Sequence, residues 1–359
     1  MIKYILMRML WAVIVLIGIL TTTFIFLKLQ PITVPNDLNQ KAVWLLKQEN
    51  LGYMTSIVIE KANEPEQADA VARAEHDPKA YTVYQDRERT VLYVYRSVPI
   101  LVQYFRWVNN VVFHFDWGTS VSMKINQPVT EILNSGISYS FKINIFVMIL
   151  EIPLGLALGI FSAIKKDTIF DNISQILIMV FISLPSFVVI SLLMKWLGSD
   201  LGWVPFMWPS GDSTASTQAR GYIIPVLSMT IGSIAGLARA VRAELAEGLT
   251  SDYVLLARTK GLTKRQAIFR HALRNSLLPI IPGLLFSFVG LISGSAIIEM
   301  IYGIPGAGSL MLQALQRQDY NVIMYDTAFY GFIGLVCGIF MDISYGFIDP
   351  RIKMGASNG

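Results

Sequence analysis

Long apolar segments recur along this 359-residue chain and limit what it can fold into. The first runs from Met9 to Leu29, and the others lie near 141–163, 173–196, 221–241, 277–300 and 323–347. Each is close to the ~20 residues that an α-helix needs to cross the hydrocarbon core of a bilayer. Helices and closed barrels are the folds that satisfy every backbone polar group in lipid. The sequence therefore predicts an all-α polytopic membrane protein with six transmembrane helices.

Composition agrees with a membrane protein, because 53% of the residues are hydrophobic and only 15% are charged. The single cysteine, Cys337, excludes an internal disulfide. The three histidines, His76, His114 and His271, are scattered, so the sequence predicts no metal site.

Basic residues predict the orientation of the helices. Lys3 and Arg8 precede the first apolar segment, which lacks a small-residue cleavage site and is interpreted as an uncleaved signal anchor. Loops expected on the same side hold Lys165, Lys166 and the basic residues of 239–276, whereas 198–220 and 301–322 hold one basic residue each. By the positive-inside rule, and with an even number of spans, both termini are expected in the cytoplasm.

Three regions follow from this topology: an N-terminal helix (1–30), a polar extracytoplasmic domain (31–140), and a five-helix core (141–353). The polar domain is an α+β insert between the first two spans, with helices expected at 36–50 and 64–75 and a strand at 90–95. Its charges nearly cancel, so it is not an obvious surface for anionic lipid, and no nucleic-acid partner is expected. The amphipathic run from Pro99 to Phe115 fits either a helix along the membrane interface or a core helix of this domain.

The segment 249–276 is a polar, basic interruption between two apolar segments. Ser251 or Thr250 can cap a short helix, Gly261 ends it, and Thr263 with Gln266 has the spacing of a capping box for a second helix. Apolar residues three and four apart, such as Tyr253, Leu256 and Ala257, give each helix one apolar side. The segment is either an ordinary basic loop or a protruding element that docks into a groove of a partner.

Glu151 lies near the middle of the second span, where a charge costs about 2.5–3.5 kcal/mol on insertion scales. It should face the helix bundle or a water-filled path rather than lipid. A buried interhelical hydrogen bond is favoured over contact with substrate.

Glycine and proline predict how the spans pack and bend. Glycines four residues apart allow close approach of helices, and they recur as Gly155/Gly159, Gly232/Gly236, Gly290/Gly294 and Gly334/Gly338. Prolines at 153, 185, 279 and 282 predict bends.

The stretch from Glu299 to Gly308 is rich in glycine but lacks the ending of a nucleotide-binding loop. It is expected to form a tight or re-entrant outer turn. The form G-x-x-x-x-G-K-[ST] occurs nowhere in the chain, so ATP-driven transport would need the ATPase on another polypeptide.

Several motifs carry a resemblance to a known family. ARTKGL (257–262), RHALRN (270–275) and LLP (277–279) are joined by QYFRW (103–107), DWGTS (116–120), PVTEIL (128–133), the E-x-x-x-x-x-P-G-x-G turn and the DPR ending. Together they resemble the permease subunits of ABC importers, in the dipeptide and oligopeptide branch. The resemblance implies the ABC type I importer permease fold, with 249–276 as the cytoplasmic coupling loop.

The resemblance also implies roles for individual residues. Those expected to couple to the ATPase are Asp252, Tyr253, Leu256, Ala257, Arg258, Lys260, Gly261 and Leu262. Candidates for the pathway or its gate are Glu151, Glu299, Pro305, Gly306 and Gly308. The resemblance implies no catalytic residue and no metal ligand.

The implied partners are a second homologous permease, two ABC ATPase subunits or domains, an extracytoplasmic peptide-binding protein and the lipid bilayer. ATP and Mg²⁺ would be used by the ATPases, with no cofactor bound by this chain, in a bacterial-type plasma membrane. A permease for nickel or another small solute is the alternative within the family. An ATP-independent secondary transporter would usually show several ionisable span residues, and a membrane enzyme would need a catalytic constellation that the sequence does not assemble.

Overall fold

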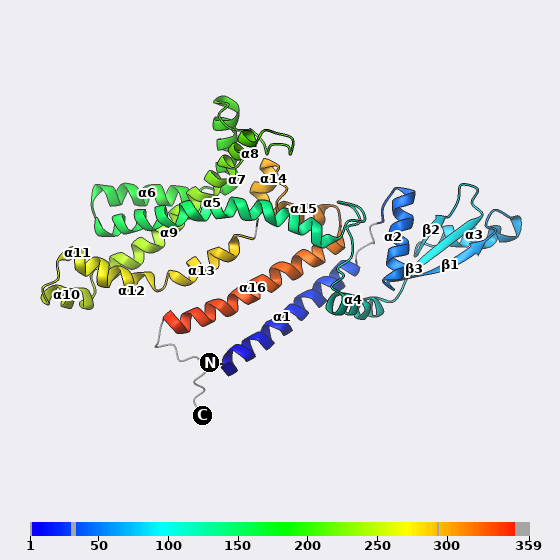
Figure 1. The fold of residues 1–359 in the computed structure, drawn as a ribbon, viewed down its shortest axis with the longest axis horizontal. Coiled ribbons are helices and arrows are strands. Elements are labelled where there is room, and N and C mark those ends of the chain that lie inside the picture. The colour runs from blue at the N-terminus through cyan, green and yellow to red at the C-terminus, as the bar shows by residue number, and fades with distance from the viewer. Residues whose placement is uncertain (1, 30–33, 293, 349–359) are drawn as a thin grey trace. The chain divides into compact units, whose positions relative to one another are not determined.

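The computed structural model describes residues 2–29, 34–292 and 294–348, which form two compact units (Figure 1). The first unit combines the N-terminal residues up to Ala12, Ser135–Leu310 and the chain from Ile333 onward. The second unit comprises Val13–Asn134 and Met311–Phe332. The DPR ending at 349–351, Lys353 and the side chain of Lys3 lie outside the described residues.

Four helical segments are long and apolar enough to cross a membrane: Ile5–Lys28, Val129–Ile164, Ala215–Gly248 and Tyr320–Ile343. They match the first, second, fourth and sixth predicted spans. The helices that form them are α1 (Ile2–Lys28), α5 (Val129–Ile164), α8 (Ala215–Gly221) with α9 (Ile223–Gly248), and α16 (Tyr320–Ile348). The α5 helix begins well before the predicted span, and Pro153 lies inside it without ending it.

The third predicted span is broken. Helix α6 (Ile169–Ser183) and helix α7 (Ser186–Leu193), which continues into the π-helical turn η2 (Met194–Asp200), meet at an angle of 96°. Pro185 explains the break, since the residue before a proline avoids helical geometry and Leu184 is extended, with ψ of 120°. Counted as one span, this pair brings the described chain to five candidates.

The fifth predicted span, 277–300, contains two short helices instead of one long helix. These are α13 (Ile281–Gly290) and α14 (Ala296–Tyr302), followed by α15 (Ala307–Gln316). The predicted count of six transmembrane helices is therefore not confirmed by helix length and composition.

Close approach of helices is confirmed at one of the four predicted glycine pairs. A Cβ atom on Gly155 would lie 2.9 Å from the Leu237 side chain, and one on Gly159 would lie 2.7 Å from the Ala238 carbonyl oxygen, both on α9. At Gly232/Gly236 and Gly334/Gly338, no described atom lies within 4 Å of such a Cβ. The α5–α9 contact therefore requires glycine, whereas those two pairs face open space.

Helix α9 also packs against α6 and α7 in the first unit (Figure 1). Asp171 on α6 is 1% exposed and accepts two hydrogen bonds from Arg242 on α9, from Nε at 3.0 Å and from Nη2 at 2.7 Å. This bidentate ion pair is the strongest polar contact between the two helices. In the sequence, Arg242 is only one of many basic residues in 239–276, and nothing there pairs it with Asp171.

The second unit contains helices and a β-sheet in the chain between α1 and α5. Helices α2 (Leu38–Asn50) and α3 (Ala68–Glu75) and strand β3 (Val91–Ser97) match the predicted elements, and β1 (Met54–Glu60), β2 (Ala80–Tyr84) and a 3₁₀ turn η1 (Pro65–Gln67) are additional. The sheet is antiparallel with order β1-β3-β2. Alternate residues of β3 point to opposite faces: Leu92 packs with Ala74 of α3, and Tyr95 packs with Trp44 of α2.

We expect Asp171→Asn to lower the free energy of unfolding by about 3 kcal/mol, because it leaves the partly buried Arg242 without its counter-ion. Thermal unfolding of the purified protein in detergent measures the effect. The matched control is Asp200→Asn, which removes an exposed ion pair with Lys195 and should change stability by about 0.5 kcal/mol or less. Equal effects of the two substitutions would contradict the assigned importance of the α6–α9 pair.

Candidate functional site

The segment 249–276 forms a helix, a glycine turn and a second helical stretch, as predicted. Its elements are α10 (Asp252–Thr259), α11 (Lys264–Ala267), the π-helical turn η3 (Ile268–Ala272) and α12 (Leu273–Leu277). Gly261 has φ of +91°, the left-handed region that glycine adopts without strain. The Gly261 amide donates to the Arg258 carbonyl at 3.0 Å, and the Leu262 amide donates to the Ala257 carbonyl at 3.3 Å.

The N-terminal cap of α11 agrees with the prediction, whereas that of α10 does not. The capping box is confirmed, because the Gln266 amide donates to Thr263 Oγ1 at 3.3 Å and the Thr263 amide donates to Gln266 Oε1 at 3.0 Å. Ser251 holds the first cap position of α10, but its hydroxyl donates to the Gly248 carbonyl. The Thr250 hydroxyl likewise donates to the Glu247 carbonyl, so neither side chain caps α10. Both hydroxyls instead satisfy carbonyls at the end of α9.

The predicted apolar stripe of α10 does not lie on one side of the helix. Val254 and Ala257 are buried against a cluster from α5, α9, α11 and η3 that is rich in alanine, namely Ala163, Leu245, Ala246, Ala267 and Ala272. Leu255 is 64% exposed and Leu256 is 55% exposed, with Tyr253 at 39%. The predicted stripe of Tyr253, Leu256 and Ala257 is thus split between an anchored side and a free side.

The segment carries many exposed charged side chains, most of them basic. Exposed are Asp252, Arg258, Lys260, Lys264, Arg265, Arg270 and Arg274, whereas Leu262 is half-buried. A surface that combines exposed leucines with basic groups suits a protein groove of opposite charge.

The far end of the segment is held to α9. Ser276 Oγ donates to the Glu244 carbonyl at 3.0 Å, and a Cβ atom added to Gly248 would collide with that Ser276 oxygen. The segment therefore rests on the ends of α5 and α9 through small residues that permit close backbone contact.

Glu151 lines a cavity of about 490 Å³ in the first unit. The other lining residues come from α9, the turn before α13 and α13 itself: Ser233, Gly236, Leu237, Ala240, Glu244, Pro279, Ile280, Gly283, Leu284 and Ser287. Among the described residues, none makes a hydrogen bond or ion pair with the Glu151 carboxylate. The favoured interhelical hydrogen bond is thus not found among the described residues, and the carboxylate borders an open space.

Glu299 is buried, with 3% exposure, and organises the turn that follows α14. Its Oε1 accepts from Ser140 Oγ at 2.7 Å, and its Oε2 accepts from the Ser309 amide at 2.9 Å. Gly306 packs directly on the carboxylate, and Gly308 packs on the backbone of Ala296. Pro305 is exposed. Four of the five pathway candidates thus lie in or beside one turn, whereas Glu151 lies at a separate cavity.

Another buried carboxylate, that of Asp319, was not among the predicted site residues. In the second unit its Oδ2 accepts from the backbone amides of Val121, Ser122 and Met123 at 3.1–3.2 Å. The resembling motif DWGTS ends at Ser120, whose hydroxyl donates to the same oxygen. In the sequence, Asp319 is only an isolated acidic residue between two helices. Its hydrogen-bond partners lie almost two hundred positions earlier in the chain, so no local pattern identifies them.

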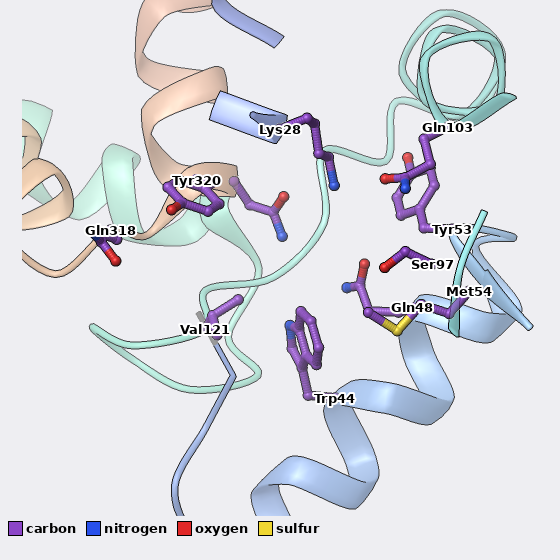
Figure 2. Close-up of a pocket in the computed structure, with 11 residues that line it drawn as sticks. Lys28, Trp44, Gln48, Tyr53, Met54, Ser97, Gln103, Val121, Gln318 and Tyr320 are labelled. Carbon is purple, nitrogen blue, oxygen red and sulfur yellow. The ribbon is translucent and has the colours of Figure 1, made fainter. Parts of the chain in front are cut away.

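The second unit also contains an enclosed cavity of about 30 Å³, where the Lys28 ammonium and the Gln48 amide point into a common space (Figure 2). Trp44 and Tyr53 contribute to its wall, and burial raises the pKa of Tyr53 to about 12, so its hydroxyl stays protonated. The space suits about two ordered water molecules. It is too small for a peptide, so it is a structural feature of the polar domain.

The described residues hold no group of three or more His, Cys, Asp or Glu side chains placed to bind a metal ion. The long apolar helices define a multi-pass membrane protein, the class to which transport permeases belong.

Comparison with known proteins agrees with this class. Residues 155–354 match the family described as "Binding-protein-dependent transport system inner membrane component". The chain is 31% identical over 262 residues, 73% of its length, to the dipeptide transport system permease protein DppB of Bacillus subtilis, covering 82% of that protein. It is 36% identical to DppB of Lactococcus lactis, covering 71% of this chain and 82% of the relative. It is 32% identical to the oligopeptide transport system permease protein OppB of Salmonella typhimurium, covering 71% of this chain and 81% of the relative.

The chain therefore belongs to the family of binding-protein-dependent transport system inner membrane components. The matched region contains the whole of segment 249–276, the Glu299 turn and all of the cavity except Glu151 itself.

We expect Glu299→Ala to lower the free energy of unfolding by about 3 kcal/mol, because the Ser140 hydroxyl and the Ser309 amide lose their buried acceptor. Thermal unfolding in detergent measures this loss. Glu247→Ala, at an exposed position of α9, is the control and should leave the melting temperature unchanged. Reduced uptake with unchanged unfolding in Glu299→Ala would instead assign Glu299 to the pathway alone.

Proposed function

We propose that this chain is one permease subunit of an ATP-driven ABC importer of dipeptides or oligopeptides. The observation that carries the proposal is the segment 249–276, which presents exposed leucines and basic side chains on a base anchored to two long helices. Membership of the binding-protein-dependent family supports the importer, and the names of the relatives support a peptide substrate.

The proposed partners follow from the same family. A second homologous permease completes the pathway, two ATPase subunits or domains bind the 249–276 segments, and an extracytoplasmic binding protein delivers the peptide. ATP and Mg²⁺ are used by the ATPases. In this proposal the broken segments α6–η2 and α13–α14 supply the remaining crossings, giving six in total, with both termini in the cytoplasm and the domain 31–140 outside.

Movement of the ATPases reaches the membrane through α10. Asp252, Tyr253, Leu256, Arg258 and Lys260 form the docking side, while Ala257 and Leu262 fix α10 to its base. Because the base consists of the ends of α5 and α9, a push on α10 acts directly on two membrane helices. Gly261 sets the angle between α10 and the capped α11.

The Glu151 cavity is the proposed contribution of this chain to the peptide pathway. Its volume of about 490 Å³ lies in the range of 300–1,000 Å³ that is typical of small-molecule sites. A carboxylate that has no partner among the described residues can accept a hydrogen bond from a passing peptide at little cost in protein structure.

We expect Gly261→Val to reduce peptide uptake about tenfold, equivalent to ~1.4 kcal/mol of lost coupling, while ATP hydrolysis continues. A β-branched residue at φ of +91° is strained, so the turn changes its angle and the docking side of α10 is displaced. Uptake and ATPase activity are measured on importer purified through a tag on this chain. The control is Gly211→Val, since Gly211 has open space around it and is not among the positive-φ glycines.

Two results would contradict this proposal. One is recovery of the tagged chain active and without an ATPase, which would favour a secondary transporter. The other is normal, ATP-coupled uptake in Gly261→Val, which would remove the turn from the mechanism.

We expect Glu151→Gln to change the KM or the rate of peptide uptake at least about threefold while the unfolding temperature stays within error, because the change breaks no hydrogen bond among the described residues. Glu247→Gln, on the exposed surface of α9, serves as the matched control. Unchanged uptake in Glu151→Gln would exclude this carboxylate from the pathway.

A further inference from the structure

Helix α4 (Ile100–His114) exposes an apolar face that the rest of the described chain leaves uncovered. Leu101, Phe105 and Val112 are 72%, 68% and 65% exposed and share one side of the helix, and Phe113 beside them is 76% exposed. Contiguous large apolar side chains on a protein surface mark a site of interaction with a partner or a membrane.

The opposite face of α4 is well packed. Gln103 is 3% exposed and donates to the Val98 carbonyl at 2.7 Å, and Trp107 is 8% exposed. The buried side satisfies the expectation of a core helix, so the exposed side is not a product of poor packing. One face of α4 is therefore covered by the protein itself, and the other face is left for a different environment.

Contacts with α1 show where α4 lies along a membrane span. Tyr104 makes a hydrogen bond with Thr21 at 2.6 Å, and the Phe24 ring lies 5.5 Å from the Tyr104 ring and 5.4 Å from the Trp107 ring. Helix α4 thus lies against the last two turns of α1 (Figure 1). With 27 residues, α1 is about 40 Å long, enough to carry its final turns from the hydrocarbon core into the headgroup region.

Aromatic side chains gather at this level. Trp107 lies 6.0 Å from Trp117, and Trp117 lies 5.2 Å from Tyr325 near the start of α16, another candidate span. Tryptophan and tyrosine concentrate where membrane helices meet the headgroups. The ends of two spans and the helix α4 therefore share one aromatic belt.

From these contacts we infer that α4 is an interfacial helix, whose face of Leu101, Phe105, Val112 and Phe113 inserts into the lipid leaflet at the end of α1. The last turns of α1 also carry an exposed apolar side chain, Phe26, which is 67% exposed. Lipid accounts for the whole uncovered face without requiring any further protein.

The polar border of the face agrees with a headgroup environment. Arg106 donates to the Gly52 carbonyl, which holds its guanidinium between α4 and the loop after α2. Asn109 lies on the same border, in a groove of about 500 Å³ that also includes Phe105. The sequence of α4 contains Arg106 and His114 but no acidic residue, so no carboxylate of this helix would be brought against lipid phosphates.

The depth of α4 in lipid can be measured directly. A Cys337→Ser background leaves no other thiol, and Phe105→Cys or Val112→Cys is labelled with an environment-sensitive fluorophore. The full chain, assembled with its importer partners, is placed in nanodiscs with or without lipids that carry a spin label near the headgroup. Arg87→Cys, in the exposed turn between β2 and β3, is the water-facing control.

We expect the spin-labelled lipid to quench both α4 probes about twofold or more and to leave the Arg87→Cys probe unchanged. Equal, weak quenching at all three positions would overturn the inference. Quenching of the chain alone that disappears in the assembled importer would also overturn it, because a protein partner would then cover the face. The measurement does not depend on the transported substrate, so a failed peptide-uptake assay leaves its result intact.

Discussion

The structure depends on one constraint, which is that every backbone group freed where a helix breaks must find a partner away from water. Buried polar side chains from distant segments meet this requirement. Asn144 of α5 donates to the Gly290 and Leu291 carbonyls at 3.0 and 3.2 Å, where α13 ends. Glu299 accepts from the Ser309 amide, and Ser140 accepts from the Ala307 amide at 2.9 Å. In the second unit, Asp319 accepts from three successive amides of the 121–123 loop.

These contacts explain how much of the fold the sequence predicts. Hydropathy identifies α1, α5, α9 and α16. Membrane helices satisfy their backbone groups within the helix, so each of these spans can be recognised from its own sequence. The break at Pro185 was expected for the same local reason. The division of 277–300 into α13 and α14 was not expected, since the amide that stabilises it comes from Asn144, far away in the sequence. A hydrogen-bond partner that is distant in the sequence leaves no periodic pattern within the segment that it stabilises.

The candidate site shows the same division between local and distant causes. The Thr263–Gln266 capping box and the Gly261 turn depend on residues within a few positions of each other, and both were predicted. The buried face of α10 was not, because it is selected by Ala163 on α5 and Ala246 on α9 rather than by the pattern within α10. Likewise, Asp171 and Arg242 are 71 positions apart, and charge alone did not pair them. The sequence therefore predicts the helices and the turn of segment 249–276 but not which side of α10 is buried.

Contacts within the first unit connect that segment to the membrane helices in a definite order. Val254 and Ala257 fix α10 to α9 through small side chains, so little compressible volume separates them. Helix α9 is joined to α6 by the Asp171–Arg242 pair and to α5 by the Gly155–Leu237 contact. A displacement of α10 in the proposed importer would therefore move α5, α6 and α9 together. Helix α7 lies beyond the 96° break at Pro185, but it also packs against α9. Ile190 of α7 shares a buried cluster with residues of α5 and α9, so side-chain packing rather than the backbone of the third span connects α7 to the proposed lever.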